Sequence, residues 1–305
     1  MERRDFPVLG RKVFFINPPL AISTYVFDAL KEDQFEAYCI DNYKVAKSLL
    51  KNYPDSICFI FIDDQLTLRE WYNFIKSFEY DEDLKSIFLG VISSRIRATD
   101  RDKFMLELKL PGGFVMLGGP VAGVYNTIKG ILTVNGAKGR RKFIRYNCSE
   151  NRDISGYITH NMKIYPFKTN IISTSGIVSV FDKDTARLLQ KGVRIQTLFL
   201  NVKRKNINLS GHVYDIKPGT KVSYVIILFD GDMDANVKSS ILGFIYDNLK
   251  LKMDFEIYRA PGDTSDYSVD KPPKQDSGQA SSENFESPEA NEILKDIGEL
   301  EEVPQ

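Results

Sequence analysis

The chain has few of the residues that build metal centres and disulfide frameworks. Its 305 residues include only three cysteines and two histidines. Cys39, Cys58 and Cys148 lie far apart and form no C-x-x-C pair, which excludes a zinc site of the usual spacing and a disulfide framework. Two histidines leave little room for a catalytic triad or a histidine–metal enzyme. We therefore expect a protein that is not an enzyme and that uses no cofactor or metal.

Long apolar runs and a net charge are missing as well. The longest runs, Ile57–Ile62 and Val225–Phe229, have strand length rather than the roughly 20 residues of a membrane helix. The N-terminus has no apolar signal segment, so free cysteines predict a cytoplasmic location without membrane insertion. Lys plus Arg and Asp plus Glu each number 41. This balance argues against a nucleic-acid partner.

The zero net charge conceals an uneven distribution along the chain. Residues 261–305 carry twelve acids and three bases, a net charge of −9, so the preceding 260 residues carry +9. The last segment is rich in Ser, Pro, Gln and Glu, a composition that buries too little apolar surface to fold. We predict a disordered acidic tail over 260–305. Ile293, Ile297 and Leu300 are spaced as one face of a short helix, which is either a nascent helix or a docking helix for a partner or for the basic body.

The N-terminal part, residues 1–134, alternates strand and helix patterns. Helical spacing recurs over 68–78 and 121–131. The apolar runs between the helices are nearly continuous, as in parallel strands covered on both faces. These runs are Val13–Ile16, Ala37–Ile40, Ile57–Ile62, Ile87–Ile92 and Phe114–Leu117. The pattern predicts a doubly wound α/β domain.

After residue 134 the pattern changes to one strand after another. The runs are β-branched and aromatic and are separated by turn residues such as Lys217-Pro-Gly-Thr220. A final helix is predicted to begin with Asp232 or Asp234 as its N-cap. Residues 135–259 are therefore predicted to form a small antiparallel β-barrel with a C-terminal helix.

The densest positive charge lies at the junction of the two parts. Five bases occur within eight residues: Lys138, Arg140, Arg141, Lys142 and Arg145. Such a run is usually a solvated surface, but a guanidinium also binds phosphate bidentately and stacks on or forks onto guanine. Arg141 and Arg145 form an R-x-x-x-R motif, which is weak by itself because Arg97 and Arg101 form a second copy. Ser173-Thr-Ser-Gly176 follows 28 residues after Arg145 and offers a hydroxyl and a close approach to the backbone.

With these motifs the C-terminal part resembles the PilZ domain family, bacterial receptors for cyclic di-GMP. The resemblance covers about 120 residues and includes Leu209-Ser-Gly-His-Val213 and the closing helix. It implies a six-stranded barrel, with cyclic di-GMP as ligand. The implied ligand residues are Arg141, Arg145, Ser173 and Gly176, with Arg140 in support.

One position departs from the family pattern. The family usually has Asp or Asn two residues before the serine, where this chain has Ile171. The nearest amide is Asn170, one residue earlier, and a one-residue step along a strand turns a side chain to the other face. Asn170 is therefore a ligand candidate only if a bulge intervenes.

The N-terminal part looks like a response-regulator receiver domain, on element order and a few positions. Asp63-Asp64 follow the third run, where receivers accept phosphate, and Ser93 follows the fourth. Asn17-Pro18-Pro19 replaces the acids that hold Mg²⁺, and Gly119-Pro120 replaces Lys-Pro. Without these charges phosphoryl transfer lacks stabilisation. We predict a pseudo-receiver used for protein contact.

Three functional hypotheses follow. The first is a cyclic di-GMP effector that relays its signal through an unidentified protein partner, such as motility machinery. The second is a ligand-independent adaptor with a PilZ fold, because a fold alone does not establish function. The third is a phosphorylated response regulator, which the missing acids disfavour.

Overall fold

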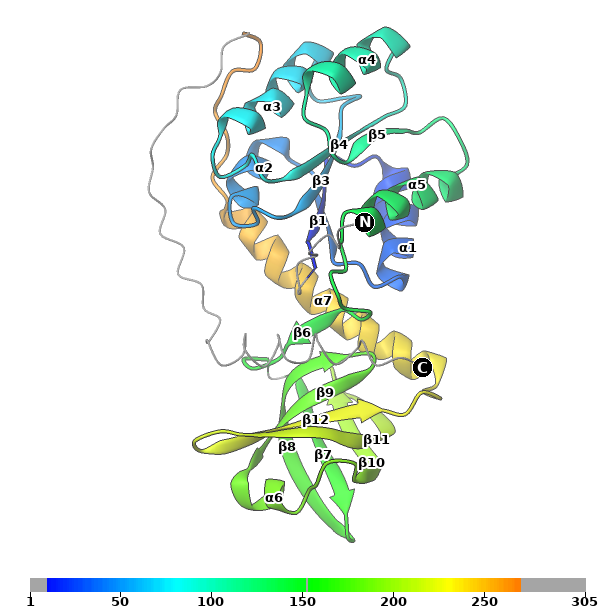
Figure 1. Cartoon of the computed structure of the whole chain (residues 1–305), viewed down its shortest axis with the longest axis vertical. Helices are drawn as coiled ribbons and strands as arrows, with labels where there is room; N and C mark the ends of the chain where they lie inside the picture. The colour runs from blue at the N-terminus through cyan, green and yellow to red at the C-terminus, as the bar shows by residue number, and fades with distance from the viewer. Residues whose placement is uncertain (1–9, 152, 270–305) are drawn as a thin grey trace, which may run out of the picture. The chain divides into compact units, whose positions relative to one another are not determined.

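The computed structural model describes residues 10–151 and 153–269. The chain divides into two compact units (Figure 1). The α/β unit comprises the described residues of Met1–Lys142 and Met253–Gln305, and the barrel unit is Phe143–Lys252. The domain boundaries expected after residues 134 and 259 stay predictions.

The α/β unit contains a five-stranded parallel sheet with the strand order β2-β1-β3-β4-β5. Its strands are β1 (Val13–Ile16), β2 (Ala37–Ile40), β3 (Ile57–Phe61), β4 (Phe88–Ser93) and β5 (Gly113–Met116). All residues of β1 and β3 are buried, which explains their continuous apolar sequences. This order is one of the two common doubly wound arrangements. The predicted α/β fold class is confirmed.

Helices cover both faces of this sheet (Figure 1). They are the π-helical turn η1 (Ile22–Val26), α1 (Phe27–Glu32), α2 (Tyr43–Leu50), α3 (Leu68–Tyr80), α4 (Ala98–Glu107) and α5 (Val121–Val134). Apolar residues of η1, α1 and α5 form one core with β1 and β3. On α3, Thr67 and Glu70 form a capping box, which fixes the start of the helix.

The barrel unit is a closed antiparallel barrel of six strands. The strands are β7 (Ile154–His160), β8 (Lys163–Ser173), β9 (Gly176–Asp182), β10 (Arg194–Val202), β11 (Lys205–Pro218) and β12 (Val222–Phe229). They pair in the order β8-β7-β10-β11-β12-β9, and the β8–β9 pairing closes the ring. A short strand, β6 (Arg145–Asn147), adds to β8. The six-stranded barrel predicted from the sequence is confirmed.

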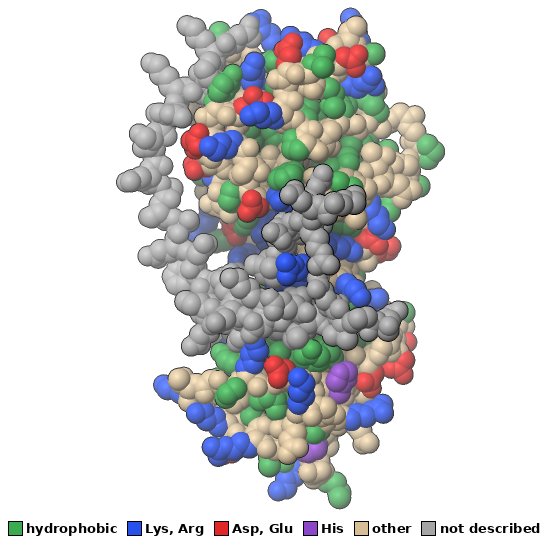
Figure 2. All heavy atoms as spheres, viewed as in Figure 1, with side chains coloured by type: hydrophobic (Ala, Val, Ile, Leu, Met, Phe, Trp, Pro, Cys, Tyr) green, Lys and Arg blue, Asp and Glu red, His purple; other side chains and the backbone are tan. Residues whose placement is uncertain are grey.

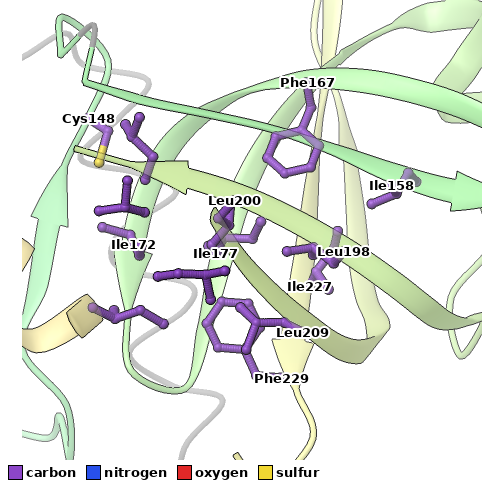
Figure 3. Packing of buried hydrophobic residues seen from close by; sticks show 14 of the residues in the cluster. Cys148, Ile158, Phe167, Ile172, Ile177, Leu198, Leu200, Leu209, Ile227 and Phe229 are labelled. Atoms are coloured by element: carbon purple, nitrogen blue, oxygen red, sulfur yellow. The ribbon is translucent and has the colours of Figure 1, made fainter. Parts of the chain in front are cut away.

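Two helices complete the barrel unit, α6 (Lys183–Arg187) and the first part of α7 (Ala235–Arg259). Asp234 caps α7 by accepting hydrogen bonds from the backbone N–H groups of Asn236 and Val237. Ile241 and Phe244 of α7 belong to the barrel core. Figure 3 shows the side chains of this core converging from the strands. The closing helix is thus held by burial of its apolar face.

Charged side chains are spread over the visible surface of each unit, with Lys and Arg next to Asp and Glu (Figure 2). Among the described residues, no helix combines the length and the apolar composition that crossing a bilayer requires.

A short segment after α7, residues 260–269, packs onto the α/β unit as a strap. Tyr267 is 6% exposed and packs edge-on against Phe74 of α3. The Lys47 Nζ of α2 donates to the Tyr267 hydroxyl at 2.6 Å and lies 3.7 Å from Asp263 Oδ2. Asn73 Nδ2 donates to the Tyr267 carbonyl at 2.8 Å.

The strap lies within the segment that the sequence analysis predicted as a tail. Disorder was expected from residue 260; the structure describes residues 260–269, and Tyr267 is buried among them. The rest of the predicted tail, including Ile293, Ile297 and Leu300, lies outside the described residues and stays a prediction.

Replacing the anchor of the strap should destabilise the α/β unit. We expect Tyr267→Ala to lower the free energy of unfolding by about 3 kcal/mol, because it empties a buried aromatic site. Tyr80→Ala, at a tyrosine that is 49% exposed, is the matched control. Urea unfolding measures both, and equal midpoints for the two variants would contradict the docked strap.

The stability of the strap should also depend on pH. Burial lowers the pKa of Lys47 to about 8, although Asp263 opposes this shift. The unfolded chain therefore binds more protons than the folded chain between about pH 8 and 10.5, and stability due to Lys47 rises with pH across this window and is absent below it. The side chain of a Lys47→Met variant does not titrate. Relative to this variant, we expect the free energy of unfolding of the unchanged protein to increase by about 2–3 kcal/mol across this window. Unfolding midpoints that run parallel for the two proteins would contradict it.

Candidate functional site

Strand β8 contains one residue more than a regular pairing allows. Phe167 and Ile172 both belong to the barrel core, although they are five residues apart. In a regular strand an odd separation puts side chains on opposite faces. The pairing with β9 advances by two residues in β8, from Thr169 to Ile171, while it advances by one in β9. Asn170 is therefore the extra residue of a β-bulge.

A hydroxyl and a guanidinium share one face of the sheet next to the bulge. Counting from Ile172, which belongs to the barrel core, Ser173 faces outward. Arg145, the first residue of β6, pairs directly with Ser173, and directly opposed residues share a face. The predicted residues Arg145 and Ser173 therefore come together, and Asn170 lies at the bulge three residues before Ser173. Their groups are of the kinds that bind phosphate oxygens and guanine edges.

The Ser173 side chain also organises the β8–β9 turn. Its Oγ accepts the backbone N–H groups of Ser175 and Gly176, each at 3.2 Å, and donates to the Gly176 carbonyl at 3.1 Å. These bonds satisfy backbone groups that the turn leaves unpaired.

Gly176 is required by close packing at the start of β9. A Cβ atom there would lie 2.4 Å from the Ile227 carbonyl oxygen of β12. Both Ser173 and Gly176 therefore have a structural role that is independent of any ligand. Ser173 is only 5% exposed and Asn170 only 7%. The Asn170 carbonyl accepts the Cys148 backbone N–H at 2.6 Å, which extends the β6–β8 pairing.

The other two predicted arginines precede the barrel unit and are described with the α/β unit. Arg140 is exposed and Arg141 is half-buried. Burial raises the pKa of Glu36, whereas the ammonium of Lys12 lowers it. A hydrogen bond from Tyr38 and the charge of Arg141 lower it further, so the pKa lies below its ordinary value. Arg141 therefore interacts electrostatically with a carboxylate of the α/β unit.

The carboxyl edge of the parallel sheet holds the aspartates of the receiver comparison. The Asp63 carboxylate, 5% exposed, accepts the hydroxyls of Ser93 and Ser94 and the Ser94 backbone N–H, the last at 2.6 Å. Arg95 lies beside it and donates to the Asp63 carbonyl. These internal donors occupy the oxygens that a phosphoryl group would need.

The neighbouring Asp64 is held in the same way. Asn17 donates to its carboxylate, and Gln65 donates to Asn17 at 2.6 Å. Within the described part of the chain, no three His, Cys, Asp or Glu side chains are grouped so that they could hold a metal ion. The predicted pseudo-receiver role of this unit stays a prediction.

Comparison with known proteins finds no matching family model and no matching curated protein. The chain is similar to solved structures of PilZ-domain proteins. The PilZ domain of YcgR from Escherichia coli with c-di-GMP is 13% identical, with a TM-score of 0.34 over 39% of this chain and 98% of that one. The MrkH–c-di-GMP complex from K. pneumonia is 14% identical, with a TM-score of 0.34 over 38% and 55%. MotI (DgrA), an inhibitor of motility from Bacillus subtilis, is 15% identical, with a TM-score of 0.30 over 35% and 50%.

The chain thus spans about half the length of the MrkH and MotI structures. The sequence analysis did not predict the bulge, which only the displaced amide at Asn170 indicated. It also did not predict the strap, which only a tyrosine in a polar segment indicated.

The donors around Asp63 predict a structural role for its carboxylate. We expect Asp63→Ala to lower the free energy of unfolding by about 2–4 kcal/mol, because it leaves buried donors without an acceptor. Asp64→Ala, at the exposed neighbour, should cost less. Thermal unfolding measures the difference. A larger loss for Asp64→Ala, or phosphorylation of Asp63 by acetyl phosphate, would contradict this role.

Proposed function

We propose that the barrel unit is a receptor for cyclic di-GMP and that the chain is a non-enzymatic cytoplasmic effector. The ligand residues in this proposal are Arg145, Asn170, Ser173 and Gly176, with Arg140 and Arg141 contributed by the junction. The observation that supports it is the direct pairing of Arg145 with Ser173, which puts a guanidinium and a hydroxyl on one face of the sheet. The bulge in β8 meets the condition under which Asn170 remains a ligand candidate despite the departure at Ile171.

The burial of Asn170 and Ser173 bears on how a ligand would bind. Side chains that are 7% and 5% exposed are reached only if the surrounding chain moves. A nucleotide that binds the rearranged conformation more tightly shifts the population toward it. The rearrangement would then be relayed through contacts with a protein partner, in keeping with the effector role. Motility machinery is the partner class that we propose.

A second candidate, a ligand-independent adaptor, is favoured by a different observation. Ser173 closes a turn and Gly176 prevents a clash, so both would be retained without any ligand. Arg141 likewise interacts within the α/β unit. A third function, phosphoryl transfer to Asp63, is not proposed, because internal donors occupy its oxygens.

Calorimetric titration with cyclic di-GMP tests the proposal. We expect saturable binding by the intact chain, and a loss of affinity of about tenfold or more for Arg145→Ala and for Arg141→Ala, since each removes a charge-assisted contact. The double variant of Arg97 and Arg101 to Ala removes the other R-x-x-x-R motif and is the matched control. It should bind as the unchanged protein does.

Asn170→Ala separates the two candidates. Ser173→Ala is unsuitable because it also breaks the turn, whereas Asn170 is placed at the bulge by backbone pairing. We expect Asn170→Ala to weaken binding several-fold, by about 1 kcal/mol. No heat with cyclic di-GMP at about tens of micromolar, or equal affinity in every variant, would refute the receptor and leave the adaptor.

A further inference from the structure

The strap, residues 260–269, lies on one surface of α2 and α3 within the α/β unit (Figure 1). We call this surface the strap site and define it by Lys44, Lys47, Asn73 and Phe74. Among the strap residues only Tyr267 is buried, and the others are exposed or half-buried. One anchored side chain therefore holds the segment, and a segment with so few buried contacts opens readily.

The strap site holds the backbone of the strap through contacts that do not depend on sequence. Asn73 Nδ2 donates to the carbonyl of Tyr267 at 2.8 Å and to that of Val269 at 3.3 Å. The Lys44 carbonyl accepts the backbone N–H of Asp263 at 2.6 Å. Carbonyls two residues apart point to the same side in an extended chain, and every residue has one. The strap site is therefore suited to extended peptides in general.

Two strap side chains supply the specific contacts. The Lys47 Nζ donates to the Tyr267 hydroxyl at 2.6 Å, and this hydroxyl donates to the Asp263 carboxylate. The ammonium lies 3.7 Å from Asp263 Oδ2, and the Lys47 side chain is only 12% exposed, so it needs these partners. The Tyr267 ring packs edge-on against Phe74, with 5.3 Å between the ring centroids. The strap site thus recognises a carboxylate four residues before a tyrosine.

The other charged groups near the strap site do not change this specificity. Asp81 and Lys51 act on Lys47 in opposite directions, and they pair with each other at 2.9 Å. The second acid of the strap, Asp266, is exposed and repels Glu70 of α3. Only the carboxylate at the position of Asp263 is therefore favoured by the charges of α2 and α3.

The connection between α7 and the strap limits where an occupant can come from. Four residue steps separate Arg259, the last residue of α7, from Asp263, and they span at most about 14 Å. A second copy must therefore bring the end of its own α7 to this place. The α7 of the first copy already lies there, because Glu256 accepts the hydroxyl of Tyr53. A peptide segment that no helix precedes is free of this limit.

We propose that the strap site is a docking site for an extended segment of a partner protein with an acidic residue four positions before a tyrosine, and that the strap is its competitor within the chain. The tethered strap acts at an effective concentration in the millimolar range, as expected for a short linker. It therefore excludes weak segments and admits those that bind more tightly than it does. The strap site belongs to the α/β unit alone, so its occupancy does not depend on nucleotide binding by the barrel unit.

Peptide binding by the full chain tests recognition of a separate segment. The probe is a fluorescent peptide with the sequence of residues 260–269, and the receptor is the Tyr267→Ala chain, whose own strap has lost its anchor. We expect saturable binding by fluorescence polarisation, at least about tenfold tighter than to the unchanged chain, where the tethered strap competes. The same peptide carrying Tyr267→Ala should bind about tenfold more weakly. No binding, or equal binding to both chains, would overturn the proposal.

Two lysine variants of the Tyr267→Ala chain form a matched pair. Lys47→Met removes the ammonium that meets the tyrosine and the acid, and should weaken peptide binding about tenfold. Lys44→Met removes a lysine one turn earlier on α2 but keeps the carbonyl that accepts the Asp263 N–H, and should leave the affinity unchanged. Equal losses in the two variants would contradict the recognition by Lys47.

Hydrogen exchange in the unchanged chain gives a result even if Tyr267→Ala does not fold. The peptide is acetylated so that its mass differs from that of the strap. At about millimolar concentration it should displace the strap and speed the exchange of the strap amides about tenfold, whereas the peptide carrying Tyr267→Ala should not. Absence of this acceleration refutes displacement by a separate segment.

Light scattering distinguishes a partner protein from a second copy. We expect the unchanged chain and Tyr267→Ala to have the same molar mass in solution at every concentration. A dimer of the unchanged chain that Tyr267→Ala abolishes would overturn the proposal in favour of the strap of a second copy.

Discussion

The single extra residue in β8 determines which side chains the barrel buries and which it presents. After the bulge, Ile172 packs into the core, where a regular strand starting at Phe167 would turn it outward. The same step puts Ser173 on the outer face, opposite Arg145. Closing the ring through the β8–β9 pairing and forming the candidate site therefore rest on one local irregularity. Its register is held from both sides, by β9 and by β6.

Sequence patterns were sufficient for the layers of both units but not for this irregularity. The buried runs Val13–Ile16 and Ile57–Ile62 are apolar throughout because both faces of the parallel sheet are covered, so they predict strands directly. In β8 the order Thr169, Asn170, Ile171 is compatible with either phase of the alternation. The phase is decided by which residues of β9 lie opposite, and the residues of β8 alone do not specify that pairing.

The strap illustrates a different limit of sequence reasoning. Composition averages over a segment, and residues 260–305 are polar and acidic on average. Ordering of the first ten residues depends instead on one ring, Tyr267, that meets the aromatic side of α3, and on Asp263 beside the buried ammonium of Lys47. The partners of both residues lie some 200 positions earlier in the chain, where no local pattern reveals them.

Whether the barrel is a receptor or an adaptor depends on residues that the fold does not require. Ser173 and Gly176 carry the resemblance to the ligand-binding family, yet the turn and the β9–β12 packing account for both. Their presence is therefore equally expected under either function. Asn170 is different, because a bulge accepts many residue types and nothing in the backbone pairing requires an amide there. The adaptor gives no reason for an amide at this bulge, whereas a guanine-binding surface uses such a group, so Asn170 favours the receptor.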